Sequence, residues 1–165
     1  MNEAAINLRP AVPADAALIF TLVGELAAYQ GISEIEANES MLAAVLFAKE
    51  PRAFCTLAHY GEVPAGFILW YYTFSTFRGR HGIWIEDIYV REKFRGKSIG
   101  KMLLASIARR CVDENLSRLE WAVLDWNTSA IAFYEAMGAR LMREWTMCRL
   151  EGAALAASAD GSRSS

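Results

Sequence analysis

The chain has few of the residues that cross-link a protein or bind a metal. Its 165 residues include only three cysteines, Cys55, Cys111 and Cys148, and two histidines, His59 and His81. The cysteines are odd in number and widely spaced, with no C-x-x-C pair and no histidine at metal-ligand spacing. We therefore expect three reduced, mostly buried thiols in a cytoplasmic protein, no disulfide framework and no metal site.

Strong net charge and long apolar runs are also missing. The formal net charge is −2, so no overall basic field attracts nucleic acid or an anionic membrane. No apolar stretch reaches the roughly 20 residues that a membrane helix needs. Arg9, Pro10, Pro13 and Asp15 interrupt the N-terminus, where a leader peptide would have its apolar core. We expect neither a nucleic-acid partner nor a membrane partner.

What the chain does have is apolar material for a sizeable core. Hydrophobic residues make up 54% and aromatic residues 12% of the sequence, which is far too apolar for a disordered chain. The length suits a single core. We expect one domain over residues 1–151. Residues 152–165, rich in Ala, Ser and Gly, have little to bury and are expected to form a flexible tail.

Apolar spacing predicts strands and helices that alternate from about the middle of the chain onward. In the helix expected at 99–112, Met102, Leu103, Ile107 and Ala108 are predicted to face inward. The order predicts an α/β fold with antiparallel strands first and crossover helices later. Strands are expected at 6–9, 53–60, 63–74, 83–90 and 119–126, with a strand or strand pair at 141–150, and helices at about 15–30, 41–49, 99–112 and 127–137.

A basic loop with two glycines follows the strand expected at 83–90 and opens a helix. Backbone N–H groups at a helix start lack helical partners, and the helix dipole adds partial positive charge there. Arg95, Lys97 and Lys101 add full charges and Ser98 a hydroxyl, so the loop suits an anion. Residues 95–101 fit neither a Walker A nor a Rossmann spacing. A solvated basic turn is the alternative.

Glu86 and Asp87 interrupt an otherwise apolar strand. Neighbouring residues of a strand point to opposite faces, so the two side chains are not expected to share one patch of solvent. Because buried carboxylates are costly without partners, the pair is a candidate functional site. A strand end that emerges into water is the alternative.

Asn127 and Tyr134 form a third candidate group. Asn127 lies between an expected strand and an expected helix, which suits an N-cap. Tyr134 lies two turns into that helix. Taken alone, capping explains Asn127, and a core position explains Tyr134.

Together, the segments at 85–90, 95–100 and 125–134 resemble the GCN5-related N-acetyltransferase (GNAT) superfamily, and within it the spermidine/spermine (diamine) N-acetyltransferases. The resemblance covers residues 6–150. It implies a GNAT-type α/β fold, a mixed and mostly antiparallel central sheet flanked by about four helices. It also implies acetyl-CoA as cosubstrate without a metal, a small-molecule amine as the partner, and a homodimer.

The resemblance also implies roles for individual residues. Tyr134 would be the general acid, and Glu86 would meet the amine. A strand amide near Tyr89 would polarise the thioester carbonyl. Substrate contacts would come from Tyr29, Glu86, Asp87, Glu144 and Trp145. Coenzyme contacts would come from Ile88, Tyr89, Val90, Arg95, Gly96, Lys97, Ser98, Ile99, Gly100, Lys101, Asn127, Thr128, Ser129 and Ala130.

Three positions depart from the family pattern. Ser98 replaces a glycine of the loop, and Gln30 replaces a carboxylate after Tyr29. The segment before Trp145, which contains Glu144, is shorter than in the family. The leading hypothesis is direct acetyl transfer, in a ternary complex, to a primary amine of a polyamine-like or thialysine/lysine-like molecule. The alternatives are a protein or antibiotic N-acetyltransferase and a non-catalytic coenzyme-A-binding sensor.

Overall fold

The computed structural model describes residues 4–159 and contains one mixed sheet of five strands in the order β1-β2-β3-β4-β5. The first three pairings are antiparallel and the last, between β4 and β5, is parallel. The strands are β1 (Ile6–Pro10), β2 (Phe54–Tyr60), β3 (Val63–Ser75), β4 (Arg80–Val90) and β5 (Leu119–Trp121). The helices are α1 (Ala16–Gln30), α2 (Glu39–Leu46), α3 (Ile99–Asp113), α4 (Thr128–Ala136) and α5 (Gly152–Ala159), with 3₁₀ turns at Pro13–Asp15 and Glu92–Phe94. The predicted α/β fold and its mixed, mostly antiparallel sheet are confirmed.

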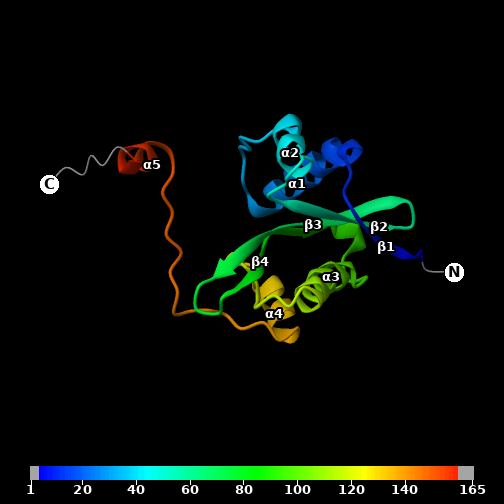
Figure 1. Cartoon of the computed structure of the whole chain (residues 1–165). Coiled ribbons are helices and arrows are strands. Elements are labelled where there is room, and N and C mark those ends of the chain that lie inside the picture. The colour runs from blue at the N-terminus through cyan, green and yellow to red at the C-terminus, as the bar shows by residue number, and fades with distance from the viewer. Residues whose placement is uncertain (1–3, 160–165) are drawn as a thin grey trace. The chain divides into compact units, whose positions relative to one another are not determined.

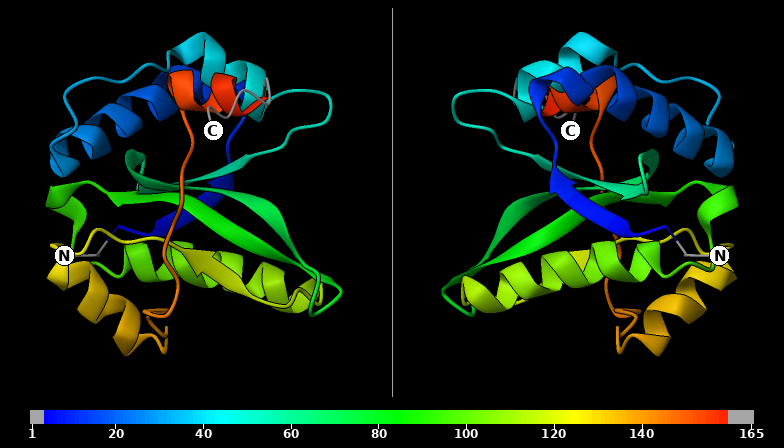
Figure 2. Two further views of the ribbon diagram at one scale, coloured as in Figure 1. Left: turned by 90° about the vertical axis from the view of Figure 1, so that its left-hand side faces the viewer. Right: turned by 90° about the vertical axis from the view of Figure 1, so that its right-hand side faces the viewer.

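The chain divides into two compact units, 1–122 and 123–165, and each is described by itself. The first unit contains the whole sheet. Helices α1 and α2 cover one of its faces and α3 crosses the other, as Figure 1 and Figure 2 show. The core under α1 and α2 consists of buried apolar side chains, among them Ile19, Leu22, Leu57, Phe67 and Leu69.

Local sequence signals set several element ends. Gly31, at φ +75°, ends α1 in the left-handed conformation that glycine adopts at low cost. The side chain of Asn38 caps α2 by accepting the Met41 N–H at 3.0 Å. The cap starts α2 two residues before the predicted Met41, and α2 ends at Leu46 rather than at Lys49.

Two predicted boundaries around β4 were wrong. The turn expected at 77–82 is shorter, because Arg80 and His81 already pair with Ser75 and Phe74. Strand β5 stops at Trp121 rather than at Trp126, because its pairing with β4 ends at Ile85.

In α3 the predicted inward face was partly wrong, since Met102 and Ala108 are exposed. The buried face is formed by Ile99, Leu103, Leu104, Ile107 and Cys111.

The strand or strand pair predicted at 141–150 is absent from the described part of the chain, and this prediction was wrong. Residues 142–150 are exposed. Apolar residues favour a strand only where a neighbour supplies hydrogen bonds, and none of the strand pairings described involves this segment. The expected tail begins with helix α5, whose residues are exposed. Its last residues, 160–165, lie outside the described range, so a single domain with a flexible tail stays a prediction.

Cys55 and Cys111 are buried free thiols, and Cys148 is an exposed one. Over residues 4–159, no helix combines the length and apolar character needed to cross a membrane. The same residues include no cluster of three or more side chains suited to hold a metal ion. The absence of a metal requirement stays a prediction.

Candidate active site

Glu86 lies at a β-bulge in the middle of β4. Leu69 of β3 pairs with Asp87, but the next residue, Trp70, pairs with Ile85, so Glu86 is the extra residue. A bulge leaves one residue out of the ladder and re-aims its side chain. Glu86 is exposed, and its carboxylate accepts a hydrogen bond from the Trp84 indole N–H at 3.1 Å. The strict alternation of faces expected for a regular strand therefore does not hold at Glu86. The bulge, rather than the pleat, sets the direction of its side chain relative to that of Asp87.

Asp87 lies on the face of the sheet that α1 and α2 cover. Its pairing with Leu69, which in turn pairs with Cys55, places the three side chains in one row. Burial, and secondarily the charge of Glu86, raises the pKa of Asp87 to about 6. Burial also raises the pKa of the Cys55 thiol to about 12, so Cys55 stays a protonated, unreactive thiol at neutral pH.

Beyond the bulge, one edge of β4 has no strand neighbour among the described residues, because pairing with β5 ends at Ile85. The other edge pairs with β3 as far as Val90. The Arg91 N–H donates to the Ala65 carbonyl oxygen at 2.9 Å. Backbone groups of a strand point alternately to its two edges, so Tyr89 also faces β3. The amides directed at the other edge are those of Ile88 and Val90, the two neighbours of the predicted Tyr89.

The loop after β4 enters α3 through two left-handed residues. Gly96 has φ +75° and Ser98 has φ +63°. The first helical hydrogen bond runs from the Met102 N–H to the Ser98 carbonyl oxygen at 2.9 Å. Helical geometry therefore leaves the N–H groups of Ile99, Gly100 and Lys101 without an intrahelical acceptor. This donor set fits the diphosphate of a nucleotide coenzyme.

Two cations of the loop rest on tyrosine rings. The Arg95 guanidinium carbon lies 4.6 Å from the centre of the Tyr29 ring, and the Lys97 ammonium lies 4.9 Å from that of Tyr60. The Arg95 Nε also donates to the Val90 carbonyl oxygen at 3.2 Å. Lys101, one turn into α3, is exposed. Tyr29 was expected on the substrate side, and the structure places it beside a predicted coenzyme residue.

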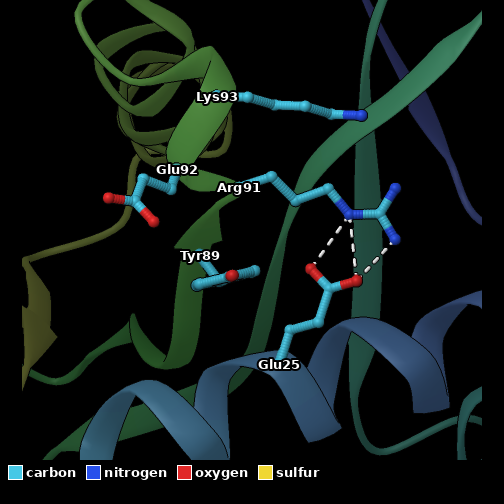
Figure 3. Close-up of a pocket in the computed structure, with 5 residues that line it drawn as sticks. All are labelled: Glu25, Tyr89, Arg91, Glu92 and Lys93. Carbon is cyan, nitrogen blue, oxygen red and sulfur yellow. Dashed lines mark hydrogen bonds and ion pairs between the residues drawn. The ribbon is translucent and has the colours of Figure 1, made fainter.

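Sequence reasoning missed the ion pair between Arg91 and Glu25. The Arg91 guanidinium donates three hydrogen bonds of 2.6–3.1 Å to the Glu25 carboxylate and a fourth, of 2.9 Å, to the Pro64 carbonyl oxygen. Figure 3 shows the pair beside Tyr89, with Glu92 turned away from it. A hollow of about 630 Å³ lies among Glu25, Tyr89, Arg91, Glu92 and Lys93. The partners are 66 residues apart in the chain, so no local pattern reveals them.

The second unit contains the remaining predicted residues. The Asn127 side chain caps α4 by accepting the Ala130 N–H at 3.3 Å and also accepts the Ser129 hydroxyl at 3.2 Å, which confirms the predicted cap. Tyr134 is buried, and burial raises its pKa, so its hydroxyl stays protonated at neutral pH. Thr128 is the first residue of α4.

Glu144 and Trp145 are exposed residues of the segment that follows α4. The structure thus brings together, within the first unit, the predicted residues on β4, on the loop and at the end of α1. Those at 127–134 and at 144–145 belong to the second unit. The roles assigned to all of them stay predictions.

An exposed carboxylate at a strand bulge, a strand edge without a neighbour in the described chain and a basic helix start together suit a nucleotide coenzyme that binds beside an acidic group. The sequence profile of the acetyltransferase (GNAT) family matches residues 24–139. The chain belongs to this family, which uses acetyl-CoA, and it is an N-acetyltransferase. The predicted family and enzyme class are confirmed.

Two curated relatives illustrate the similarity. The chain is 35% identical to a thialysine N-epsilon-acetyltransferase of Bos taurus over 162 residues, covering 91% of this chain and 95% of the bovine protein. It is 47% identical over 95 residues to an L-ornithine N5-acetyltransferase of Arabidopsis thaliana, covering 58% of this chain but only 42% of the plant protein. Among solved structures, an integron cassette protein of V. cholerae matches with a TM-score of 0.77 at 25% identity, over 93% of this chain and 97% of that one.

Proposed function

We propose that this enzyme transfers the acetyl group of acetyl-CoA directly, in a ternary complex, to a primary amine of a small thialysine/lysine-like or polyamine-like molecule. The observation that carries the proposal is the exposed Glu86 carboxylate at the β4 bulge, next to the edge of the same strand that has no strand neighbour beyond Ile85 among the described residues. The similarity to a thialysine acetyltransferase along nearly its whole length supports this substrate class.

The coenzyme side of the site would be built mainly from backbone. The free edge at Ile88 and Val90 would pair with the pantetheine arm in the manner of an added strand. The amides of Ile99, Gly100 and Lys101 would hold the diphosphate, with Arg95 and Lys97 adding charge. When bound, acetyl-CoA supplies an activated thioester. The Ile88 N–H is suitably directed to polarise its carbonyl oxygen.

Glu86 would position the amine and pass on its proton. An alkyl amine of pKa about 10.4 is neutral in only about one molecule in two thousand at pH 7, a handicap of about 4–5 kcal/mol. A carboxylate beside an ammonium raises the pKa of the amine while it orients the group. We therefore assign Glu86 to binding and proton relay, directly or through water, and not to strong base catalysis.

Tyr134 would return a proton to the departing thiolate. The amine nitrogen forms its bond to the acetyl carbon, the carbon–sulfur bond breaks, and the amine loses one proton while the sulfur gains one. Burial raises the pKa of Tyr134, so the hydroxyl carries its proton at neutral pH. A thiol of pKa about 8.5 is already a fair leaving group, so the help it needs is modest.

The remaining predicted roles complete the proposal. Asp87, Glu144 and Trp145 would line the amine side, and Asn127, Thr128, Ser129 and Ala130 would contact the coenzyme. We also propose a homodimer in the cytoplasm. These assignments rest on the family resemblance.

A thiol-release assay tests the proposal. Acetyl-CoA is offered with thialysine, lysine, ornithine, spermidine and spermine, and with a lysine peptide and an aminoglycoside as alternative acceptors. Release with a small amine, lost in Glu86→Gln mainly through a higher KM for the amine, is the expected result. Preference for the peptide or the aminoglycoside would favour another N-acetyltransferase. Tight binding of CoA without release for any acceptor would favour a sensor.

A further inference from the structure

Two tyrosine rings lie under the two cations that flank Gly96 in the loop before α3. Tyr29 is in the last turn of α1, and Tyr60 is the last residue of β2. They meet Arg95 and Lys97 at 4.6 and 4.9 Å from the ring centres. The two tyrosines are 31 residues apart and both precede the loop in the chain, one in α1 and one in β2, so each cation rests on a different part of the unit.

We propose that Tyr29 and Tyr60 are positioning residues for the diphosphate of the coenzyme: they hold the Arg95 guanidinium and the Lys97 ammonium in place before the ligand arrives. The proposal rests on the proposed function of the loop. Neither tyrosine needs to touch the coenzyme.

The physical reason lies in the long side chains of arginine and lysine. Each loses much rotamer freedom when it is fixed on a ligand. A cation that already rests on the face of an aromatic ring, attracted by the ring quadrupole, has less freedom left to lose. The contact therefore favours coenzyme binding by preorganisation.

The Tyr60 ring is itself held in place. It lies against Phe94, with ring centres 5.6 Å apart, and Phe94 is buried. The Lys93 ammonium lies 5.1 Å from the centre of the Phe94 ring. The Arg95 side chain is fixed at a second point by its bond to the Val90 carbonyl oxygen. The loop cations thus have supports that are anchored to the sheet and to α1.

Binding of CoA, measured by calorimetry, tests the proposal. Tyr60→Leu is expected to raise the Kd for CoA about two- to fivefold, the size of one partly exposed cation–π contact. Tyr60→Phe keeps the ring face and should bind as the wild type does. Adding Tyr60→Leu to Lys97→Gln should change nothing further. Tyr29→Leu, which removes an exposed ring, should raise the Kd for CoA by a similar factor. It tests the proposal independently if Tyr60→Leu does not fold.

Truncated ligands locate the effect. The same loss is expected with 3′-dephospho-CoA, which keeps the diphosphate. With S-acetylpantetheine, which lacks it, kcat/KM should equal that of the wild type. Tyr72→Leu is the control. It also removes a tyrosine ring, but Tyr72 bonds Glu114 through its hydroxyl and pairs with Ile83 near the start of β4, not with the loop before α3. It should leave CoA binding unchanged.

Several outcomes would overturn the proposal. One is a Kd for CoA that is unchanged or lower in both Tyr60→Leu and Tyr29→Leu. The others are a Kd for CoA that rises as much in Tyr60→Phe as in Tyr60→Leu, and a kcat/KM with S-acetylpantetheine that falls by the same factor as CoA binding. A wild-type chain that does not bind CoA at all would instead refute the proposed function, so the two failures are distinguishable.

Discussion

Arg91 and Glu25 join the end of β4 to the middle of α1 through three hydrogen bonds between one guanidinium and one carboxylate. Both side chains are partly shielded, at 20% and 32% exposure. The pair fastens α1 to the end of β4, from which the loop that leads into α3 departs.

A double-mutant cycle with Arg91→Gln and Glu25→Gln measures this coupling. We expect a coupling free energy of about 1–2 kcal/mol in urea unfolding, because charge-assisted, multidentate bonds are the stronger ones. The Arg110–Glu114 pair, also 2.6 Å long but more exposed, is the matched control and should give about 0.3–0.5 kcal/mol. Equal coupling in the two pairs would contradict the prediction.

Gly66 allows β3 and β4 to approach each other closely. A Cβ at this position would lie 2.3 Å from the Tyr89 carbonyl oxygen, a backbone atom. Gly66→Ala should therefore destabilise the fold by about 1–3 kcal/mol, in the range of other overpacking changes. Because the strain falls on the β4 segment assigned to the coenzyme, CoA binding should weaken as well.

Gly24→Ala is the control for this change. Gly24 lies inside α1, and a Cβ there meets nothing within 4 Å. Alanine should stabilise the helix by about 0.5–1 kcal/mol. Thermal or urea unfolding of the two variants checks the opposite signs, and a stable Gly66→Ala protein would show that the strands separate at little cost.

Asp87 makes stability depend on pH. Its pKa is raised from an ordinary 3.8 to about 6, mainly by burial, so folding favours the protonated form. The stability contributed by Asp87 is complete below about pH 4 and is lost as the pH rises through 6. Relative to wild type, Asp87→Asn should gain up to about 3 kcal/mol between pH 4 and pH 8.

Urea unfolding of both proteins across this range is the measurement. Asp113→Asn changes an exposed carboxylate at the end of α3 and serves as the control. A constant difference between Asp87→Asn and wild type at every pH would show that Asp87 is ionised in the folded protein as readily as in the unfolded one.

Tyr134→Phe should slow turnover without abolishing it. We expect kcat to fall about 10- to 100-fold, at or below the low end of general acid catalysis, because the thiolate is a fair leaving group. The KM for acetyl-CoA should change little. Steady-state kinetics test this prediction. Tyr72→Phe, which loses a hydroxyl bonded to Glu114, is the control. An unchanged kcat in Tyr134→Phe would remove Tyr134 from the mechanism.

Ser98→Gly should relieve backbone strain at the start of α3. A non-glycine residue at φ +63° costs about 1–2 kcal/mol of folding free energy. Glycine removes this cost, but the greater freedom of the unfolded glycine chain offsets about 0.5–1 kcal/mol of the gain. We expect a net gain of about 0.5–1 kcal/mol in unfolding free energy. Ser98→Ala, which keeps the strain, should show no gain. Equal stability of the two variants would contradict this account.

Elements with strong local signals could be predicted from the sequence. The helix expected at about 15–30 and the Asn127 cap depend on local features, and the structure contains both. Pairing is not local. The short β5, the early start of β4 at Arg80 and the absence of a strand at 141–150 depend on which backbone edges meet, and apolar spacing does not encode this.

The candidate site divides in the same way. Glu86 and Asp87 were recognisable because two carboxylates interrupt an apolar strand. The bulge that separates them was not, since it arises from the register between β3 and β4. The Glu25–Arg91 pair and the rings under Arg95 and Lys97 bring together distant segments, and single residues of common types give no signal of such contacts.

The bulge also shifts the phase of β4. Ile85 and Ile88 pair with Trp70 and Ile68, which share one face of β3, although residues three apart in a regular strand face opposite ways. Deleting Glu86 would therefore do more than remove a carboxylate. It would remove the bulge and leave a regular ladder in which Asp87 and the later residues of β4 keep their β3 partners and their faces. The extra residue is therefore what lets an exposed carboxylate stand between two residues that keep consecutive β3 partners, so deleting Glu86 should disturb the pairing of β4 less than deleting a paired neighbour such as Ile88.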